Sequence, residues 1–379
     1  MNRRHLLAAG LAVAAAPRMA FAAPAFHTRW SVRGSEGFDA LCFLGPLSGK
    51  PFYASYYTAE LADFLPRFPK PAAAALATLQ AAADARGVLL GPTLCLLFSG
   101  GADATLDDLI ANLDAAETRL KPAYRASAYW DADDWAAFTA GRPLIRAVLA
   151  GLREADFPGL RRRFVAGKLA ARIPALKTRV AGLDVIGEQQ RLLGRPLPPS
   201  LEIILLWFSK PHGIRVQGQR FLTHVDYPDQ IVLRNAAHEV FHPPFPMQGP
   251  AARAALAVLG ADPLIGRIVA EHDPAFGYNS LPGYFEEDTV QALEQVVSER
   301  LGFASPPASR WKADDGMHVL AAGLYGLLKA DGFDRTGGRI EAWIGAAAAG
   351  AGLAPGPLHA AAAAVLQVPP DGLWPRKLA

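Results

Sequence analysis

Residues Asp229–His242 read DQIVLRNAAHEVFH, a stretch that combines a helical apolar pattern with paired histidines. The apolar positions that recur at helical spacing are Val232, Leu233, Ala236, Ala237, Val240 and Phe241. Asp229 is placed to cap a helix that begins near Gln230. We expect this helix to end at His242, because Pro243 follows and a residue before proline disfavours the α conformation.

Two histidines four residues apart lie on one face of a helix, so the imidazoles of His238 and His242 can reach a single zinc ion. Glu239 follows the first histidine, where its carboxylate can act as the general base that takes a proton from zinc-bound water. The alternative is a helix that carries two histidines without binding metal. A catalytic zinc also needs a third protein ligand.

That third ligand is expected in the sequence YFEEDTVQAL, residues 284–293, at the start of a predicted second helix. An HExxH helix followed by a glutamate on a second helix resembles the gluzincin metallopeptidases, the thermolysin-like class, and in particular an uncharacterised group of secreted bacterial HExxH proteins. The resemblance covers residues 200–301. It implies a zinc site made by His238, His242 and Glu287, with Glu239 as the catalytic base.

The choice of the third ligand stays open between neighbouring carboxylates. The residues five, six and nine positions after Glu287 are small or apolar, as in the family pattern, whereas a helical wheel places Glu286 nearer the middle of the apolar face. Glu294 and His272 are further alternatives. Without the upstream motif, such an acidic cluster indicates a solvated first turn that the helix dipole favours. Gln291 departs from the family, which has an acidic residue four positions after the ligand.

Attack on a carbonyl also needs a donor that stabilises the developing oxyanion. The candidates are Tyr278, Tyr284, Tyr325 and His318, and for each of them the alternative is an ordinary packing role. The strand predicted within residues 213–225 would accept an extended substrate by strand addition.

The composition is that of a globular protein, since 51% of the 379 residues are hydrophobic and 19% are charged. The formal net charge is only +3, and no basic stripe with interleaved aromatic residues is present, so nucleic acid is not an expected partner. Cys42 and Cys95 each lie in an apolar run. They are expected either to pair in an oxidising compartment or to stay as buried thiols.

The first 22 residues predict an export signal, because Arg3-Arg4 precedes an apolar stretch and Ala20-Phe21-Ala22 resembles a cleavage site. The paired arginines resemble a twin-arginine signal, and an ordinary secretory signal is the alternative. We therefore expect a periplasmic or secreted protein. No stable membrane anchor is expected after signal removal, because no later apolar run has the length and character of a span.

The predicted fold is α+β, predominantly helical, with a small mixed sheet and a zincin-like pair of active-site helices. Residues 201–209 (LEIILLWFS) predict a central strand, and residues 213–225 predict a hairpin or edge strand. The run LCLLF at residues 94–98 is expected as a buried strand, and strand-like and turn-like patches also occur at residues 30–32, 41–44 and 52–57.

The linker RPLPPS at residues 195–200 separates two predicted regions, which form either two units or one. Residues 23–195 are expected to be mostly helical with some strands, and Pro122, Pro143, Pro158 and Pro174 are expected to mark helix boundaries there. Residues 196–379 are expected to form the zincin-like catalytic region.

These patterns together predict an exported zinc metallohydrolase that cleaves peptide bonds in peptides or proteins. The first alternative is an exported zinc-binding module without peptidase activity, which has no need of Glu239. The second is an amidase or esterase acting on non-peptide substrates, because the chemistry is the same.

Overall fold

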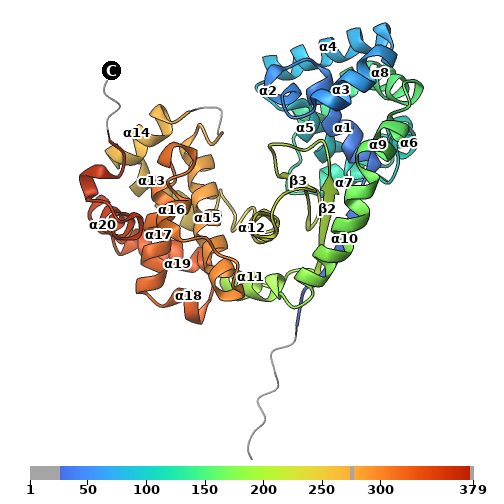
Figure 1. Ribbon diagram of the computed structural model, residues 1–379. Helices are drawn as coiled ribbons and strands as arrows, with labels where there is room; N and C mark the ends of the chain where they lie inside the picture. The colour runs from blue at the N-terminus through green and yellow to red at the C-terminus, as the bar shows by residue number, and fades with distance from the viewer. Residues whose placement is uncertain (1–25, 274–276, 376–379) are drawn as a thin grey trace, which may run out of the picture.

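The computed structural model describes residues 26–273 and 277–375, so the predicted export signal at residues 1–22 lies outside the described residues. The chain is predominantly helical, at 64%, and its described residues form one small mixed sheet of four strands. The predicted α+β class is therefore confirmed. Figure 1 shows that α12 lies between a group of helices around the sheet and a second group of helices formed by the C-terminal part of the chain.

The sheet is built from strands that are far apart in the sequence. They are β1 (Arg29–Gly34), β2 (Ser200–Leu206), β3 (Ile214–Val216) and β4 (Arg220–His224). Their order is β1-β2-β4-β3, with β1, β2 and β4 parallel and β3 antiparallel to β4. The predicted central strand is thus β2, and the predicted hairpin is β3–β4. The apolar run of β2 is continuous because a parallel strand between two neighbours is buried on both faces.

Most of the helices that precede β2 lie on the side of the molecule that contains the sheet, whereas α11 contacts α12, α15 and α19 (Figure 1). The helices that precede β2 are α1 (Glu36–Leu47), α2 (Pro51–Ala54), α3 (Thr58–Phe64), α4 (Lys70–Ala85), α5 (Leu90–Phe98), α6 (Leu106–Asp114), α7 (Leu120–Ala126), α8 (Ala132–Glu154), α9 (Phe157–Phe164), α10 (Ala166–Val180) and α11 (Val185–Leu193). Among the described residues, no single helix is long and apolar enough to cross a membrane, and α4 with α5 reaches that length only as a pair bent by 95°.

Two predictions about this part of the chain are wrong. The run at residues 94–98 lies in helix α5 instead of a strand, and residues 41–44 lie in α1. Residues 52–57 lie in α2 and the turn after it, whereas residues 30–32 lie in strand β1. A helix surrounded by core has little polar face, so its short apolar run cannot be distinguished from a buried strand by periodicity. Pro143 and Pro174 lie inside α8 and α10 instead of at their boundaries, since a proline removes only one backbone hydrogen bond from a helix that packing supports on both sides.

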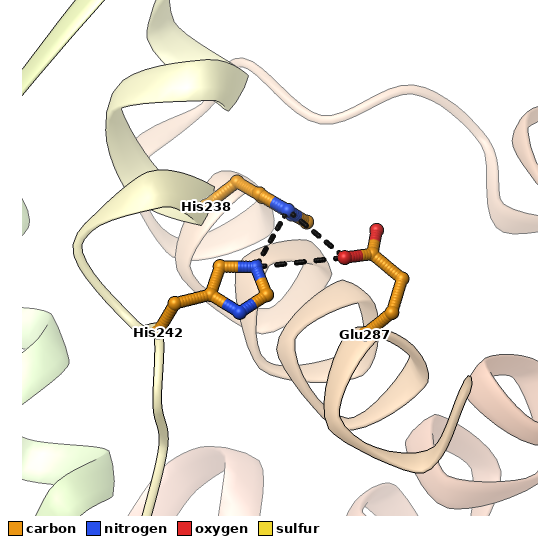
Figure 2. Close-up of side chains that lie close together, drawn as sticks. All are labelled: His238, His242 and Glu287. Atoms are coloured by element: carbon orange, nitrogen blue, oxygen red, sulfur yellow. Dashed lines mark hydrogen bonds and ion pairs between the residues drawn. The ribbon is translucent and has the colours of Figure 1, made fainter. Parts of the chain in front are cut away.

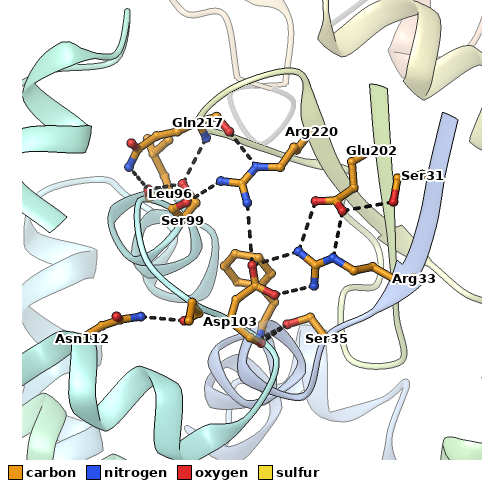
Figure 3. Close-up of polar contacts among 12 residues, drawn as sticks. Ser31, Arg33, Ser35, Leu96, Ser99, Asp103, Asn112, Glu202, Gln217 and Arg220 are labelled. Atoms are coloured by element: carbon orange, nitrogen blue, oxygen red, sulfur yellow. Dashed lines mark hydrogen bonds and ion pairs between the residues drawn. The ribbon is translucent and has the colours of Figure 1, made fainter. Parts of the chain in front are cut away.

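An ionic network ties the sheet to the loop that follows α5 (Figure 3). The guanidinium of Arg33 on β1 donates to Glu202 on β2, with Nε 2.9 Å from Oε1, and to Asp103, with NH2 3.0 Å from Oδ2. Arg220 on β4 approaches the same Asp103 carboxylate at 3.7 Å. Three strands are therefore joined to one buried carboxylate.

The two cysteines belong to helices that pack together, α1 and α5. Both are buried free thiols, and their Sγ atoms are 3.8 Å apart. Burial raises the pKa of the Cys95 thiol well above its usual value, so the protonated form is favoured.

In the C-terminal part of the chain, α12, α13, α14 and α17 contact α15, while α18 and α20 contact α17. The helices of this part are α12 (Asp229–Glu239), α13 (Pro250–Gly260), α14 (Pro263–Glu271), α15 (Leu281–Leu301), α16 (Pro307–Arg310), α17 (Val319–Ala330), α18 (Phe333–Thr336), α19 (Ile340–Ala349) and α20 (Pro355–Leu366). Helix α15 contacts α12 on one side and α17 on another, while α12 also contacts β4. Helix α12 is thus the element through which the sheet and the C-terminal helices meet.

The ends of α12 differ from the predicted ends. Asp229 is its first residue, Pro228 occupies the cap position, and the Asp229 carboxylate forms an ion pair with Arg172 at 2.5 Å instead of capping the helix. The last helical residue is Glu239, three residues before the predicted end at His242. The proline after His242 affects more than the one residue before it. Its ring would clash with a helical carbonyl four residues earlier, so the helix ends before His242.

His224 on β4 is a fully buried histidine, and its pKa links stability to pH. Its Nδ1 accepts a hydrogen bond from the backbone N–H of Asp226 at 3.0 Å, and its Nε2 is buried. Burial, followed by the charge of Lys210, lowers the pKa of His224 to about 4. The charged groups that act on the ring are Lys210, Asp226 and Lys168.

Because the folded-state pKa of His224 is lowered, the stability contributed by the neutral ring is present above about pH 6.5 and is lost as the pH falls toward 4. Between pH 7 and pH 4.5, we expect the free energy of unfolding to fall by about 2 kcal/mol more in the wild type than in His224→Asn. The asparagine oxygen can still accept the hydrogen bond from Asp226. Urea unfolding at both pH values measures the difference, and equal losses in the two proteins would contradict the prediction.

Candidate metal centre

Three of the predicted site residues converge where α12 meets α15 (Figure 2). His238 lies in the last turn of α12, His242 lies three residues beyond that helix, and Glu287 lies in the second turn of α15. The two Nε2 atoms are 3.1 Å apart, and each is 3.5 Å from Oε2 of Glu287. In a tetrahedral site with metal–ligand bonds of about 2.0 Å, ligand atoms are about 3.3 Å apart. This group could therefore hold a metal ion.

The Glu287 carboxylate is the observation that fits a cation best. Its side chain is only 3% exposed. Oε1 accepts a hydrogen bond from Gln291 at 2.9 Å, but Oε2 is buried without a hydrogen-bond partner in the described part of the chain. A buried carboxylate oxygen without a partner is costly, and a cation between it and the two imidazoles would remove that cost.

The charge states of these groups suit a metal ligand set. Burial acts to raise the pKa of Glu287, but the charge of His238, whose Nε2 is 3.5 Å from Oε2, outweighs that effect and holds the pKa at about 2. Burial acts to lower the pKa of His238, and Glu287 reverses this, so the pKa is raised. The ionised Glu287 thus attracts positive charge, and a metal ion would replace the proton that His238 otherwise takes up.

Glu286 contacts the other nitrogen of the His242 ring. Its Oε1 is 3.0 Å from Nδ1, so a proton on Nδ1 can be donated to Glu286 while Nε2 keeps a free lone pair. This carboxylate therefore orients the imidazole, which is the usual role of the group behind a ligating histidine. Of the two neighbouring glutamates, the structure brings Glu287 and not Glu286 to the two Nε2 atoms.

The other two alternatives for the third ligand lie elsewhere. Glu294 accepts a hydrogen bond from Ser298 and forms an ion pair with Arg310. The ring of His272 lies between the carbonyl oxygens of Ile268 and Gly277, each 2.8 Å from one ring nitrogen.

Gln291, the departure from the family pattern, links Glu287 to a buried arginine. Its amide nitrogen donates to Glu287, and its amide oxygen accepts from Arg310 on α16. Arg310 is 8% exposed and also donates to Gln295 at 2.8 Å. Gln291 is thereby held in the orientation that presents its amide group to Glu287. Arg310 was not found from the sequence, because it lies in a four-residue helix that no motif marks.

Glu239 lies at the C-terminal end of α12 next to the three converging residues. Its carboxylate forms no hydrogen bond or ion pair with any residue that the structure describes. Burial raises the pKa of Glu239, the charges of His238 and Arg215 oppose this shift, and the charge of Glu287 adds to it. A free carboxylate with a raised pKa is suited to accept a proton from a reacting group.

Two further residues near Glu239 come from outside the predicted site. The guanidinium of Arg215 on β3 lies 4.2 Å from the ring centre of Tyr129, which belongs to the segment between α7 and α8. The charge of Arg215 acts on Glu239 and Glu286, and its NH1 is buried without a hydrogen-bond partner among the described residues. The N-terminal region therefore reaches the site through Tyr129, which no sequence pattern indicated.

The four candidates for an oxyanion donor are separated by the structure. The hydroxyl of Tyr284 donates to the carbonyl of Met317 at 2.7 Å, and that of Tyr325 donates to Glu299. The ring of His318 contacts Asp288, with Nδ1 2.6 Å from Oδ1. Tyr278 remains a candidate: burial of its hydroxyl and then the charge of Glu287 raise its pKa, while the residue as a whole is 38% exposed.

Comparison of the chain with known protein families, curated proteins and solved structures gave no match. The arrangement of His238, His242 and Glu287 is consistent with an HExxH…E pattern. These findings support a possible metal-binding group, and they do not assign a family.

We expect Gln291→Leu to weaken zinc binding by about tenfold or more, because Glu287 loses the amide that orients it and Arg310 loses an acceptor. Competition with a chromophoric chelator measures the affinity. Gln295→Leu is the matched control, since Gln295 also accepts from Arg310 but does not contact Glu287. Equal affinities in the two variants would refute the role of Gln291.

The two neighbouring glutamates should differ in their effect on metal content. Glu287→Gln is expected to lose stoichiometric zinc, whereas Glu286→Gln keeps it, because a glutamine oxygen can still accept from His242. Zinc in the purified proteins is measured by mass spectrometry after dialysis against a fixed concentration of free zinc. Loss of zinc only in Glu286→Gln would reverse the assignment.

Proposed function

We propose that the chain is an exported zinc-dependent hydrolase that cleaves peptide bonds, with a gluzincin-type site made by His238, His242 and Glu287. The observation that carries the proposal is the buried Oε2 of Glu287, which faces two imidazole nitrogens and has no other partner within the described ranges. The proposal of export rests on the paired arginines and apolar stretch of residues 1–22.

The donor set supports zinc over other common ions. Two imidazoles and one carboxylate are the protein ligands of a catalytic zinc, whereas magnesium and calcium prefer oxygen ligands. With three protein ligands, a fourth position stays open for water or substrate. Bound there, zinc supplies Lewis acidity toward a carbonyl group and a water whose pKa is about 7.

The remaining steps are assigned to residues of the chain. Glu239 accepts the proton of the attacking water and passes it to the leaving amine, since its carboxylate is free and its pKa is raised. Tyr278 donates to the oxyanion that forms on the substrate carbonyl. His242 keeps the correct ring nitrogen toward the metal through its contact with Glu286.

The edge strand β3 is proposed to hold the substrate. It pairs with β4 on one side only, so its other edge can add an extended peptide. The strand follows directly after Gly213, whose backbone lies close to Glu239: a β-carbon built on it would be 3.8 Å from Oε1 of that residue. A peptide along this edge would thus pass the proposed general base, which supports a peptidase over an esterase.

We expect Glu239→Gln to keep about one zinc per chain and to lose at least about 100-fold of its activity against a mixed peptide library. The reason is that the amide preserves the shape of the side chain but cannot accept a proton. Glu117→Gln, on the surface in the N-terminal region, is the control for loss of a carboxylate.

Three outcomes distinguish the hypotheses. A wild-type protein that stays metal-free when zinc is supplied excludes both the hydrolase and the zinc-binding module. Zinc binding without cleavage of any peptide supports the binding module. Cleavage of amides or esters that are not peptides, with no cleavage of peptides, supports the amidase or esterase.

A further inference from the structure

A polar recess opens to solvent beside His238 and Glu239. Its other lining residues are Gly213, Arg234, Asn235, Gln291, Glu294 and Arg310. The recess extends from the converging site toward the N-terminal part of α12. None of the steps proposed above uses Arg234 or Asn235.

Helical geometry places these two residues behind the site residues. Arg234 lies four residues before His238, and Asn235 lies four residues before Glu239, so each pair shares one face of α12. One helical turn is about 5.4 Å, which is close to the distance between the reacting carbonyl and a charged group one residue away on a substrate. The recess is thus in reach of a group bound next to the scissile bond.

Both side chains are available to a ligand. The side chains of Arg234 and Asn235 form no hydrogen bond with any residue in the described part of the chain. The Nε of Arg234 is buried, and its nearest ionic neighbour is Oε2 of Glu294 at 3.7 Å, which is beyond hydrogen-bond distance. A buried donor without an acceptor is costly, so this Nε indicates a ligand.

In the recess, Arg234 and Arg310 share the carboxylate of Glu294, and the other lining carboxylate is Glu239, the proposed general base. Glu294 is 1% exposed and already forms an ion pair with Arg310 and accepts from Ser298. Burial lowers the pKa of Arg310, Glu294 opposes that shift, and the charge of Arg234 adds to it, so the two guanidinium groups repel each other. An anion between them would relieve this repulsion.

Arg215 is the other arginine near Glu239, and its surroundings differ. Its charge acts on Glu239 and Glu286, and its guanidinium lies against the ring of Tyr129. Its positive charge is therefore matched by two carboxylates of the site. Arg234 has no comparable partner, since Glu294 is shared with Arg310.

We propose that this recess is a substrate subsite, in which Arg234 and Asn235 bind a carboxylate group of the substrate next to the scissile bond. The fork of an arginine matches a carboxylate with two parallel hydrogen bonds, and the asparagine amide can donate a third. This inference rests on the proposed hydrolase function, because it places the carboxylate relative to the bond that is cleaved. The carboxylate is either the C-terminus of a peptide or an acidic side chain.

The test is binding to the zinc-loaded full chain carrying Glu239→Gln, so that no ligand is consumed. Calorimetry compares N-acetyl-trialanine with its C-terminal amide, and N-acetyl-Ala-Glu-Ala-amide with the Gln analogue. We expect one acid to bind about tenfold or more tightly than its neutral partner, and the pair that shows this identifies the source of the carboxylate. Adding Arg234→Gln should bring that ratio close to one, and Asn235→Asp should lower it by charge repulsion.

Arg162→Gln is the matched control, because the substitution removes the same charge far from the recess. Arg162 lies on α9, and 71% of its side chain is exposed. The ratio should persist there. Equal binding or no binding of acids and neutral partners overturns the subsite, as does loss of the ratio in Arg215→Gln but not in Arg234→Gln.

Peptide cleavage by the wild type is measured separately. Cleavage without preference for acids would support the hydrolase proposal and contradict the subsite. Acid-selective binding without cleavage would support the subsite and contradict the hydrolase proposal.

Discussion

The packing of α12 against α15 is the constraint on which the rest of the site depends. Helix α12 also contacts β4, and α15 contacts α17, so the crossing of these two helices joins the sheet to the C-terminal helices. Each of these two helices presents a partly polar face to the other. The histidines of one helix and the glutamate of the other meet there in a buried position, where a charge without a partner is expensive. Such an arrangement needs positive charge beside Glu287, supplied by a proton on His238 or by a metal ion, and this is the physical argument for a metal-binding group.

Much of the fold could be predicted from the sequence, and the errors have a common cause. The strand β2 and the hairpin β3–β4 were predicted because their runs are apolar or alternating and are bounded by Gly and Pro. The LCLLF run failed, since a helix buried on all sides loses the polar positions that reveal its period. Asp229 was expected as a cap and is instead the first helical residue, an error of one position that is typical of helix boundaries.

The candidate site was predicted to the extent that it is local in sequence. The spacing of His238 and His242 is a property of one short segment, whereas the distinction between Glu286 and Glu287 depends on how α15 is rotated against α12. A helical wheel averages over the whole apolar face and therefore favoured Glu286. Tyr129, Arg215 and Arg310 are brought to the site by tertiary packing from three other elements. Their roles depend on which polar atoms have hydrogen-bond partners in the folded protein, and the sequence alone does not contain that information.

His242 lies beyond the end of its helix, and this has a thermodynamic consequence. One of the three converging groups belongs to a loop whose position no helical hydrogen bonds enforce. An ion held by His238, His242 and Glu287 would close a chain segment of 45 residues between the last two, and would act as a cross-link that the unfolded chain lacks. The free energy of ion binding would then contribute to the free energy of folding, and this contribution would grow with the logarithm of the free ion concentration. The compartment that supplies the ion would thus also set how firmly the loop after α12 is folded.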